Sequence, residues 1–377
     1  MKYYLIAGEA SGDLHGSNLM KGLKAKDPNA EFRFWGGDLM ANIGGSLVRH
    51  YKDTAVMGGV EILSKLGKIA KNLQLCKEDI ITYNPDVVIL IDYPGFNMKI
   101  AKFAHEHSFK VFYYIAPKVW ATRESRIKKI KTYVDKLFII FPFEIDYFRK
   151  KQVEAIYCGN PLIDSIAQNP AMQEDRKDFL SRYNLQDKPI IALLAGSRKA
   201  EIDSLLPTYI ELAKKYSPHF QFILAAAPSI QLGYYDKYTS DTNITIIQSD
   251  TYAIVKNSKA AIVASGTASL ETAIIGTPQV VCYRVHPITA FIIRKIAKIK
   301  YVSLGNLILN KLAFKELLQE DFTLEKVSKE LDLLTKDNKY IAAMHQEYDK
   351  IKSILGKEGA SEKIAEAMIN QLHNDNL

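Results

Sequence analysis

The sequence predicts an α/β protein made of two doubly wound units, and three observations support this prediction. Short runs of branched apolar residues, such as Val87–Ile91 and Ile190–Leu194, alternate with longer stretches that have helical spacing. Runs that are apolar throughout are typical of parallel strands covered by helices on both faces. The pattern stops in a polar interval at 168–188 and then starts again, in a chain of 377 residues that is longer than a single core usually supports.

The first half of the chain is expected to alternate five strands with five helices. Each predicted strand is a short apolar run bounded by turn-forming or charged residues. The strands are predicted at 3–7, 32–35, 87–91, 111–115 and 137–141. The helices are predicted from about residue 12, from about residue 61, at 98–107, from about residue 123 (a basic helix) and at 143–151.

The second half repeats this pattern and ends differently. Strands are predicted at 190–194, 220–226, 244–248, 260–264 and 280–285, with helices between them. The segment from about Leu324 is charged, has helical spacing and contains no strand candidate. We therefore expect an N-terminal domain at 1–167, a linker at 168–187, a second domain at 188–325 and a helical tail at 326–377.

The composition excludes several classes of protein. Apolar residues make up 47% of the chain, which is enough for a core and excludes disorder as the main state. Three scattered cysteines are too few for a disulfide framework or a zinc ribbon. The opening residues do not have the pattern of a signal peptide, and no apolar run of about 18 residues exists that could span a membrane. The net charge of +8 is compatible with phosphate ligands, nucleic acid or an anionic membrane surface.

Candidate site residues are expected directly after the predicted strands, because ligands of open α/β sheets bind at the carboxyl ends of the strands. After the first strand, Gly8 and Gly12 allow close approach of the backbone, and the helix that follows offers free N–H groups near Ser11. Glu9 can form a hydrogen bond with a polyol. The alternative is a tight turn with an ordinary capping acid. His15 lies in the same segment.

A second candidate follows the strand at 87–91. Asp92 ends a wholly apolar run, and a Pro94-Gly95 turn comes next. A carboxylate in such a place is a plausible general base, because burial can raise its pKa. The alternative is a turn or N-cap residue supported by Asn97.

A third segment, at 116–126, leads from a strand into a tryptophan and two arginines. Lys118, Arg123 and Arg126 can meet a phosphate there. The alternative is a solvated basic helix with Trp120 in the core.

Two segments of the second half combine glycine, hydroxyl groups and charge after a strand. Gly196 allows backbone approach, Ser197 can cap a helix, and Arg198 can bind a diphosphate through two hydrogen bonds. The segment Ser265-Gly266-Thr267 opens a helix whose first N–H groups suit a diphosphate, and Glu271 can accept from a pair of ribose hydroxyls. A capping box that ends in Glu271 is the alternative for this segment. Neither segment matches GxGxxG or a Walker loop.

Several other chemistries are excluded or weakly supported. The sequence contains no HExxH, GxSxG or CxxC motif, and His105 and His107 are spaced so that they point to different faces of a helix. No nucleic-acid recognition motif is present. The stretch 286–300 mixes lysine and arginine with large apolar residues and contains no acid, so it can lie at an anionic membrane surface or pack as an amphipathic helix on its own domain.

Taken together, these segments make the chain resemble the lipid-A-disaccharide synthase family, glycosyltransferases of lipopolysaccharide biosynthesis. The resemblance extends over nearly the whole chain. The segments that carry it are AGEASGD at 7–13, MGGVEIL at 57–63, PDVVILIDYPGFN at 85–97, PKVWATRESR at 117–126, FPFE at 141–144, GNPLID at 159–164, AGSRKAEI at 195–202, SGTASLE at 265–271, YVSLGN at 301–306 and KELLQ at 315–319. The chain departs from the family pattern at Gly95 (usually an acid), Thr122 (usually tryptophan) and Asn160 (usually histidine), and also at Ala195 and Gly305.

The resemblance implies a GT-B fold, in which two Rossmann-like domains face a cleft and a helical tail follows. It implies an inverting transfer from UDP-2,3-diacylglucosamine to 2,3-diacylglucosamine 1-phosphate (lipid X), with a β-1,6 linkage and release of UDP. No metal and no cofactor are implied. The family's functional positions fall here on Asp92 and Glu9 as catalytic residues, and on Gly8, Ser11, Gly12, Asn97, Gly196, Ser197, Arg198, Ser265, Gly266, Thr267, Glu271, Asn306 and Gln319 as binding residues.

The resemblance also implies where the protein works and with what. Both substrates carry acyl chains, so a cytoplasmic protein bound peripherally to the inner face of the cytoplasmic membrane is expected, without nucleic-acid partners. A homodimer formed by exchange of the C-terminal segment is possible in this family. Two other functions remain open: another GT-B enzyme that uses a UDP-sugar, such as an epimerase, and a non-catalytic nucleotide-sugar sensor.

Overall fold

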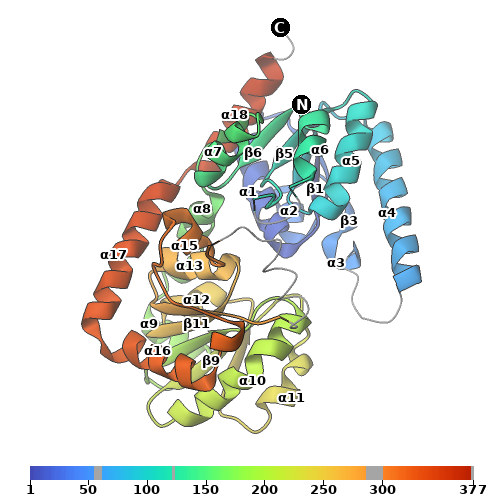
Figure 1. The fold of residues 1–377 in the computed structure, drawn as a ribbon. Coiled ribbons are helices and arrows are strands. Elements are labelled where there is room, and N and C mark those ends of the chain that lie inside the picture. Colours follow the sequence, from blue (N-terminus) through green and yellow to red (C-terminus); the bar gives the residue numbers. More distant parts are fainter. Residues whose placement is uncertain (55–61, 121–123, 286–299, 375–377) are drawn as a thin grey trace. The chain divides into compact units, whose positions relative to one another are not determined.

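Each half of the chain builds an open parallel β-sheet flanked by helices, which confirms the predicted fold class. The computed structural model describes residues 1–54, 62–120, 124–285 and 300–374. Unit 1 contains Met1–Ser165 and Lys357–Leu377, and unit 2 contains Ile166–Gly356. The ribbon in Figure 1 shows both units and labels most of their helices and some of their strands.

The sheet of unit 1 has seven strands, all parallel, in the order β3-β2-β1-β4-β5-β6-β7. The strand order reverses between β1 and β4, whose residues pair from Tyr3 with Val87 to Ala7 with Ile91. The strands are β1 (Lys2–Ala7), β2 (Glu31–Gly36), β3 (Ser46–His50), β4 (Val87–Ile91), β5 (Lys110–Tyr114), β6 (Lys136–Ile139) and β7 (Ala155–Tyr157).

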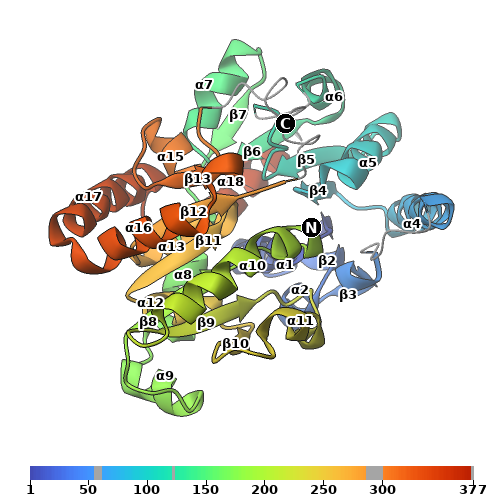
Figure 2. The same cartoon turned by 60° about the horizontal axis from the view of Figure 1, so that its bottom comes forward.

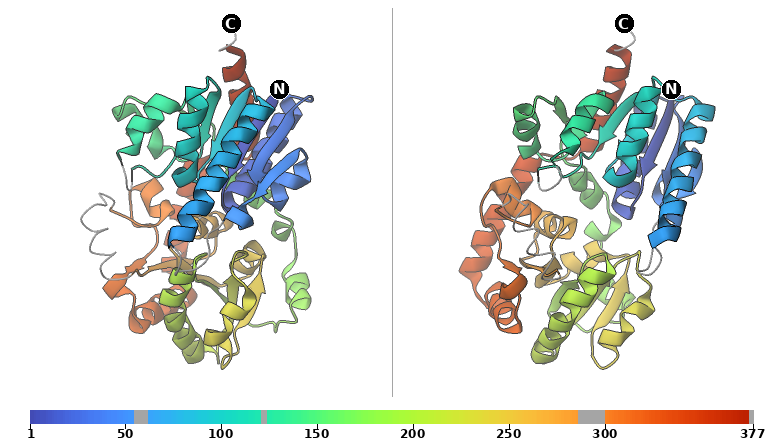
Figure 3. Two further views of the ribbon diagram at one scale, coloured as in Figure 1. Left: turned by 90° about the vertical axis from the view of Figure 1, so that its right-hand side faces the viewer. Right: turned by 45° about the vertical axis from the view of Figure 1, so that its right-hand side comes forward.

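Helices cover both faces of the sheet of unit 1. Successive side chains along each strand point to opposite faces of the sheet. Tyr4 and Ile6 of β1 share a core with Cys76, Met98 and Ile127 from three different helices. Figure 3 shows α4 and α5 lying over the strands on this face. The helices are α1 (Ala10–Lys26), α2 (Asp38–Ile43), α3 (Tyr51–Thr54), α4 (Ile62–Tyr83), α5 (Pro94–Glu106), α6 (Arg126–Tyr133), α7 (Phe143–Lys150), α8 (Pro161–Ala167) and α18 (Ala360–Asn374).

The helix α18 belongs to unit 1 because it packs on α1. A Cβ atom at Gly22 of α1 would lie 2.9 Å from the Cβ atom of Ala365, so the two helices approach closely only because Gly22 has no side chain. The buried carboxylate of Asp164 accepts hydrogen bonds from the N–H groups of Gly359 (2.7 Å) and Ser361 (2.8 Å) and so caps the start of α18. The structure therefore divides residues 326–377 between the two units, whereas the sequence suggested one tail.

The sheet of unit 2 has six strands, all parallel, in the order β10-β9-β8-β11-β12-β13. Here the strand order reverses between β8 and β11, and Leu194 pairs with Val263 at their carboxyl ends. The strands are β8 (Ile190–Leu194), β9 (Gln221–Ala226), β10 (Thr245–Gln248), β11 (Ala260–Ala264), β12 (Gln279–Tyr283) and β13 (Glu316–Leu318).

Eight helices are described in unit 2, apart from short 3-10 turns. Figure 2 shows α16 and α17 beside α13 and α15, with which α17 is in contact. The helices are α9 (Arg176–Arg182), α10 (Lys199–Tyr216), α11 (Asp236–Thr239), α12 (Thr251–Lys256), α13 (Thr267–Ile275), α15 (Leu304–Leu309), α16 (Leu324–Lys336) and α17 (Asn338–Leu355).

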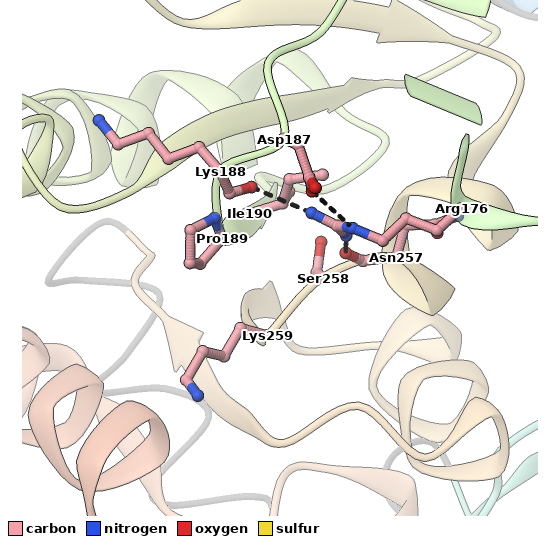
Figure 4. Close-up of a pocket in the computed structure, with 8 residues that line it drawn as sticks. All are labelled: Arg176, Asp187, Lys188, Pro189, Ile190, Asn257, Ser258 and Lys259. Atoms are coloured by element: carbon pink, nitrogen blue, oxygen red, sulfur yellow. Dashed lines mark hydrogen bonds and ion pairs between the residues drawn. The ribbon is translucent and has the colours of Figure 1, made fainter. Parts of the chain in front are cut away.

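The interval at 168–187, expected to be a linker, is folded onto unit 2. Phe179 of α9 is fully buried in the same core as Ile190 and Ile254. The guanidinium of Arg176 donates to the carbonyl oxygens of Asn257 (2.7 Å) and Lys188 (3.1 Å), as Figure 4 shows. A short helix that buries two apolar side chains, here Phe179 and Leu180, can join a core even in a polar segment, which explains the difference from the sequence-based expectation.

The cysteines and the membrane-spanning character of the helices were the subject of two expectations from the sequence. All three cysteines are free thiols. Within the described ranges, none of the helices combines the length and the apolar character that crossing a membrane requires.

Candidate active site

The carboxyl ends of β1 and β4 bring two predicted segments together in unit 1. Ala7 pairs with Ile91, so Gly8 and Glu9 continue from β1 beside Asp92, which follows β4. The strand order reverses at this point, and ligands of open α/β sheets bind where it does. The structure therefore places the first and second predicted segments at one point of the sheet edge.

The backbone at Asp92 is held in an unusual conformation. Asp92 and Tyr93 both have positive φ angles, 44° and 48°, which non-glycine residues rarely adopt. The carbonyl oxygen of Asp92 accepts from the Asn97 amide (2.8 Å) and the Tyr113 hydroxyl (2.7 Å), while its N–H donates to the carbonyl of Tyr114 (3.0 Å). Such strain persists only where the surroundings enforce it, and it is concentrated at functional sites. The backbone from which the half-buried Asp92 carboxylate projects is thus fixed.

The side chain of Asn97 lies beneath this loop. It is fully buried, and its amide also donates toward the carbonyl oxygens of Ile91 (3.2 Å) and Ile6 (3.4 Å). Asn97 therefore ties the ends of β1 and β4 to the turn at Asp92. The structure gives this predicted binding residue a supporting position without exposed surface.

Glycine is required at position 8 because the ring of Tyr93 lies against it. A Cβ atom at position 8 would lie 2.3 Å from that ring, so any side chain there would displace it. Tyr93 and Tyr113 were not among the residues predicted from the sequence. The signal for Tyr93 was its place directly after Asp92, whereas Tyr113 lies on another strand and gave no local signal.

Glu9 and Ser11 are exposed at the start of α1, and Gly12 is buried there. Glu9 occupies the N-cap position, but its side chain makes no capping hydrogen bond, so the capping alternative is not observed. The buried acid of this segment is Asp13, which accepts from the N–H groups of Gly37 (2.7 Å) and Met40 (3.1 Å) and joins α1 to α2. The carboxylate of Glu9 therefore remains available to a ligand.

The same segment contains a buried histidine. His15 is 5% exposed, and its Nδ1 atom has no hydrogen-bond partner among the described residues. Burial lowers the pKa of His15 to about 4. The imidazole is therefore neutral near pH 7.

The third predicted segment is anchored by a buried glutamate. The carboxylate of Glu144 accepts from the indole N–H of Trp120 (3.1 Å) and from the N–H of Phe141 (3.1 Å). Burial raises the pKa of Glu144 to about 7. Arg123 and Thr122 lie outside the described residues.

The departure at position 160 has a structural explanation. Asn160 is fully buried, donates to the carbonyl of Ile140 (2.9 Å) and accepts from the N–H of Leu162 (2.9 Å) at the start of α8. Gly95 is another position at which the chain departs from the family pattern. A Cβ atom there would have no neighbour within 4 Å, so a side chain would have space at this position.

In unit 2 the ends of β8 and β11 again bring two predicted segments together. Gly196 and Ser197 follow β8, and Ser265 and Gly266 follow β11, its direct neighbour. Gly196 and Gly266 have φ angles of 97° and 154°, which favour glycine. The fourth and fifth segments thus share the point where this strand order reverses.

The carboxylate of Glu201 forms hydrogen bonds with backbone N–H groups of the first of these loops. Glu201 accepts from the N–H groups of Ser197 (2.9 Å) and Arg198 (3.3 Å). A Cβ atom at Gly196 would lie 2.3 Å from the Glu201 carboxylate. The Arg198 side chain, by contrast, is 72% exposed, with one nitrogen 3.8 Å from Glu201. The group of this segment that can bind an anion is therefore the Arg198 guanidinium, because the loop N–H groups already bond to Glu201.

The second loop leads into α13 without the capping box that was the alternative for this segment. Gly266 is the N-cap, and no side chain caps the helix. The carboxylate of Glu271 instead accepts from the hydroxyl of Tyr252 (3.0 Å) on α12. Burial raises the pKa of Glu271, and the hydrogen bond from Tyr252 opposes this shift.

Three of the recognised segments are joined by one hydrogen-bond network. Glu316 accepts from the N–H of Val302 (3.0 Å), the hydroxyl of Ser303 (2.6 Å) and the amide of Asn306 (2.8 Å). The hydroxyl of Ser265 donates to the carbonyl of Val302 (3.3 Å). Asn306 is fully buried and supports the loop next to Ser265.

Gln319 lies at the end of β13. When its amide is oriented to satisfy both atoms, it donates to the carbonyl of Val285 (3.1 Å) and accepts from the N–H of Val285 (3.3 Å). Gln319 therefore fixes the backbone just before 286–299. That stretch, for which a membrane-facing role was one expectation, lies outside the described residues.

Two further features of the described residues do not form a site for a metal or a substrate. Among the described residues, no group of three or more His, Cys, Asp or Glu side chains is arranged to hold a metal ion. The hollow in Figure 4 lies at the amino ends of β8 and β11, and the Arg176 guanidinium in it is bonded to protein carbonyls. That hollow is at the edge of the sheet opposite to the predicted segments.

Comparison with known proteins agrees with the recognised segments. Residues 3–370 match the protein family described as lipid-A-disaccharide synthetase. A lipid-A-disaccharide synthase from Geobacter sulfurreducens is 33% identical over 374 residues, covering 98% of this chain and 96% of the relative. One from Coxiella burnetii is 35% identical over 370 residues, covering 97% of each.

Solved structures with a similar fold have low sequence identity. A UDP-GlcNAc 2-epimerase from Methanocaldococcus jannaschii in complex with UDP-GlcNAc and UDP has a TM-score of 0.67 at 15% identity, covering 98% of this chain and all of that one. A UDP-GlcNAc 2-epimerase from Neisseria meningitidis has a TM-score of 0.64 at 14% identity, with the same coverage. These likenesses concern the fold alone.

Proposed function

Because the chain belongs to the lipid-A-disaccharide synthase family, a family of glycosyltransferases of lipid A biosynthesis, we propose the reaction that it performs. It transfers the diacylglucosamine of UDP-2,3-diacylglucosamine to the 6-hydroxyl of 2,3-diacylglucosamine 1-phosphate (lipid X). The product carries a β-1,6 linkage, and UDP is released. The observation that carries this proposal is Asp92, an acid held in a strained turn at the point where the strand order of unit 1 reverses.

The proposed chemistry is a single displacement. The Asp92 carboxylate takes the proton of the acceptor 6-hydroxyl, and the oxygen attacks C1 of the donor sugar from the face opposite UDP. The bond between C1 and the phosphate oxygen breaks, so the configuration at C1 is inverted. Bonds from Asn97 and Tyr113 to the Asp92 carbonyl support this role, because they fix the carboxylate's backbone before substrate binds.

The donor nucleotide is proposed to bind unit 2. Arg198 compensates the charge of the diphosphate with its exposed guanidinium, and Glu271 accepts hydrogen bonds from the ribose. The start of α13 adds N–H groups that face the same point. The proposal places Gly196, Ser197, Ser265, Gly266 and Thr267 around the diphosphate, with Asn306 and Gln319 supporting the neighbouring loops. The leaving group is thus stabilised by protein groups, and a metal has no part in the proposal.

A sugar is proposed to bind at the exposed start of α1. Glu9 is proposed to position a sugar hydroxyl, with Gly8, Ser11 and Gly12 allowing its close approach. The acyl chains of both substrates place the reaction at the inner face of the cytoplasmic membrane, with the protein bound peripherally. A homodimer that exchanges α18 is also proposed, because a second copy would present the same α1 surface around Gly22.

The test is UDP release by the purified protein in detergent and EDTA, with the donor and with or without lipid X. We expect release that depends on the acceptor. Asp92→Asn should lower kcat by about 100-fold or more while UDP still binds. The matched control is Asp86→Asn, at the other end of β4. Its carboxylate accepts from the N–H of Lys2, its one hydrogen-bond donor among the described residues, and the rate should be kept.

Two results would overturn parts of this proposal. If Asp92→Asn retains near wild-type turnover, Asp92 is not the base. If UDP binds but is never released from the donor, the protein uses a different acceptor or acts as a nucleotide-sugar sensor.

A further inference from the structure

The carboxylate of Glu271 has a partner that the proposed function leaves unexplained. Tyr252 lies at the start of α12, directly after the end of β10, and its hydroxyl donates to Oε1 of Glu271 at 3.0 Å. The helices α12 and α13 pack against each other. The ring of Tyr252 is half-buried against the core of unit 2 that contains Ala253 and Ile254. The hydroxyl is therefore held in place by packing before any ligand arrives.

The geometry leaves Glu271 able to bind a second partner. A carboxylate offers about four acceptor positions, and the bond from Tyr252 uses one of them. The carboxylate is half-buried one turn into α13, close to the loop at Ser265 and Gly266. Among the described side chains, Tyr252 is the one titratable group that acts on Glu271, although α13 also packs on α15, α17, β11 and β12. The orientation of this carboxylate thus depends on a single phenol.

We propose that Tyr252 is a positioning residue for the nucleotide: its hydroxyl fixes the Glu271 carboxylate in the orientation that accepts the hydroxyl pair of a ribose. This inference rests on the proposed function, in which Glu271 holds the ribose of UDP. It predicts that Tyr252 contributes to the discrimination between ribose and deoxyribose without touching the sugar.

A purely structural role for Tyr252 has a counterpart in the same unit. Tyr216 also donates to a carboxylate, that of Asp332 at 3.0 Å, on elements that carry none of the predicted site residues. Tyr216→Phe removes a phenol–carboxylate bond and serves as the matched control for Tyr252→Phe.

The experiment measures the dissociation constants of UDP and 2′-deoxy-UDP by calorimetry on the full chain. The wild type is expected to bind UDP about 10-fold more tightly or better, because a hydrogen bond to a charged group is lost with the deoxy sugar. Glu271→Gln should bring the ratio close to one. Tyr252→Phe should lower the ratio several-fold, Tyr252→His should restore part of it through its ring N–H, and Tyr216→Phe should leave it unchanged.

The pH dependence of UDP affinity provides a second readout. The bond from Tyr252 lowers the pKa of Glu271, so its removal should raise that pKa. Since the carboxylate form binds the ribose, the part of the pH dependence that Glu271 causes should move to higher pH in Tyr252→Phe. That part should be absent in Glu271→Gln, where only the titration of the UDP phosphate remains.

The outcomes separate this inference from the proposed function. Equal weakening of both nucleotides by Tyr252→Phe, or no change in the ratio or the midpoint, would overturn the positioning role while leaving the nucleotide site intact. A wild type that binds neither nucleotide would overturn the proposed function, and the inference with it. If Tyr252→Phe does not fold, Tyr252→Leu, which also lacks the hydroxyl, decides in the same way: a ratio equal to that of the wild type, with an unchanged pH midpoint, would contradict the proposal.

Discussion

At the scale of single residues, buried and half-buried polar side chains determine the shape of three loops around the candidate site. Asn97 and Tyr113 hold the carbonyl of Asp92, Glu201 holds the loop at Ser197, and Glu316 holds the loop before α15. Each of these groups is bonded to backbone, which suits a site whose chemistry needs fixed positions. The exposed groups, Glu9 and Arg198 among them, remain for ligands.

The first prediction concerns Asn97. Asn97→Ala removes the amide that donates to the buried carbonyl oxygens of Ile6 and Ile91 and to the carbonyl of Asp92, which keeps its bond from Tyr113. Loss of a donor to buried groups typically costs about 1–3 kcal/mol. Urea unfolding should show this loss, and kcat for UDP release should fall because the Asp92 turn is released. Asn97→Asp has the same shape but cannot donate, so it should behave like the alanine variant. An unchanged kcat in both would mean that the turn does not depend on Asn97.

The second prediction concerns two buried ionisable groups of unit 1 with opposite effects. Glu144 has its pKa raised from 4.5 to about 7, so its contribution to stability is present below pH 4.5 and is lost as the pH rises through 7. His15 has its pKa lowered from 6.5 to about 4, so its contribution is present above pH 6.5 and is lost as the pH falls through 4. Each effect amounts to at most about 3 kcal/mol, and the two nearly cancel between these limits.

Urea unfolding at a series of pH values checks this cancellation. Relative to the wild type, Glu144→Gln should become more stable as the pH rises from 4.5 to 7, and His15→Asn should become more stable as the pH falls from 6.5 to 4. Stability curves that stay parallel to that of the wild type would contradict the assignment.

The sequence predicted where the site residues lie better than what each of them does. Every predicted segment follows a strand, and in parallel sheets all strands end at one edge, so their meeting could be foreseen. The supporting positions of Asn97 and Asn306 could not. The Asn97 amide reaches the carbonyl of Ile6, 91 residues away, and Asn306 bonds to residues of the loop between α15 and β13, whose path the sequence pattern does not predict. Tyr252 was missed because it lies outside the recognised segments and its partner Glu271 is 19 residues away. Glu201 lies within the recognised segment at 195–202, but its bonds to the N–H groups of Ser197 and Arg198 were not predicted.

At the scale of elements, the missed strands share one property. The sequence predicted the ten strands that include β4, β8 and β11, but not β3, β7 or β13. All three lie at an edge of their sheet. An edge strand has one neighbour and is partly exposed, so it lacks the continuous apolar run by which the central strands were predicted.

The third prediction concerns the cap of α18. Asp164→Ala removes the acceptor for two N–H groups at the start of this helix and should cost about 1–2 kcal/mol. Hydrogen exchange should increase in α18 and on the α1 surface at Gly22. The control is Asp175→Ala at the start of α9, where the aspartate makes no side-chain capping bond and its loss should have little effect. Equal effects of the two variants would mean that the cap at Asp164 does not hold α18.

At the scale of the whole molecule, the chain consists of two units of the GT-B class, each with its own core. Both sheets reverse their strand order at the point where the predicted segments meet. Under the proposed function unit 1 holds the base and unit 2 holds the nucleotide. Separate cores allow the two units to respond to ligand independently.

The fourth prediction follows from this division. UDP should slow hydrogen exchange at the ends of β8 and β11 and in α13, and leave exchange at the ends of β1 and β4 nearly unchanged. In thermal unfolding, UDP at about 100 times its dissociation constant should stabilise unit 2 by about 2.7 kcal/mol. Arg198→Ala should weaken both effects. Protection confined to unit 1 would contradict the assignment of the nucleotide to unit 2.

The return of the chain to unit 1 has a consequence for biosynthesis. On the ribosome the first 165 residues emerge without α18, so the surface of α1 around Gly22 waits uncovered until all of unit 2 has been translated. The half of the protein that is made first is therefore completed last. A ribosome that stalls or terminates early within unit 2 would release an N-terminal half with an exposed, unfinished face, which is a natural substrate for chaperones and proteases.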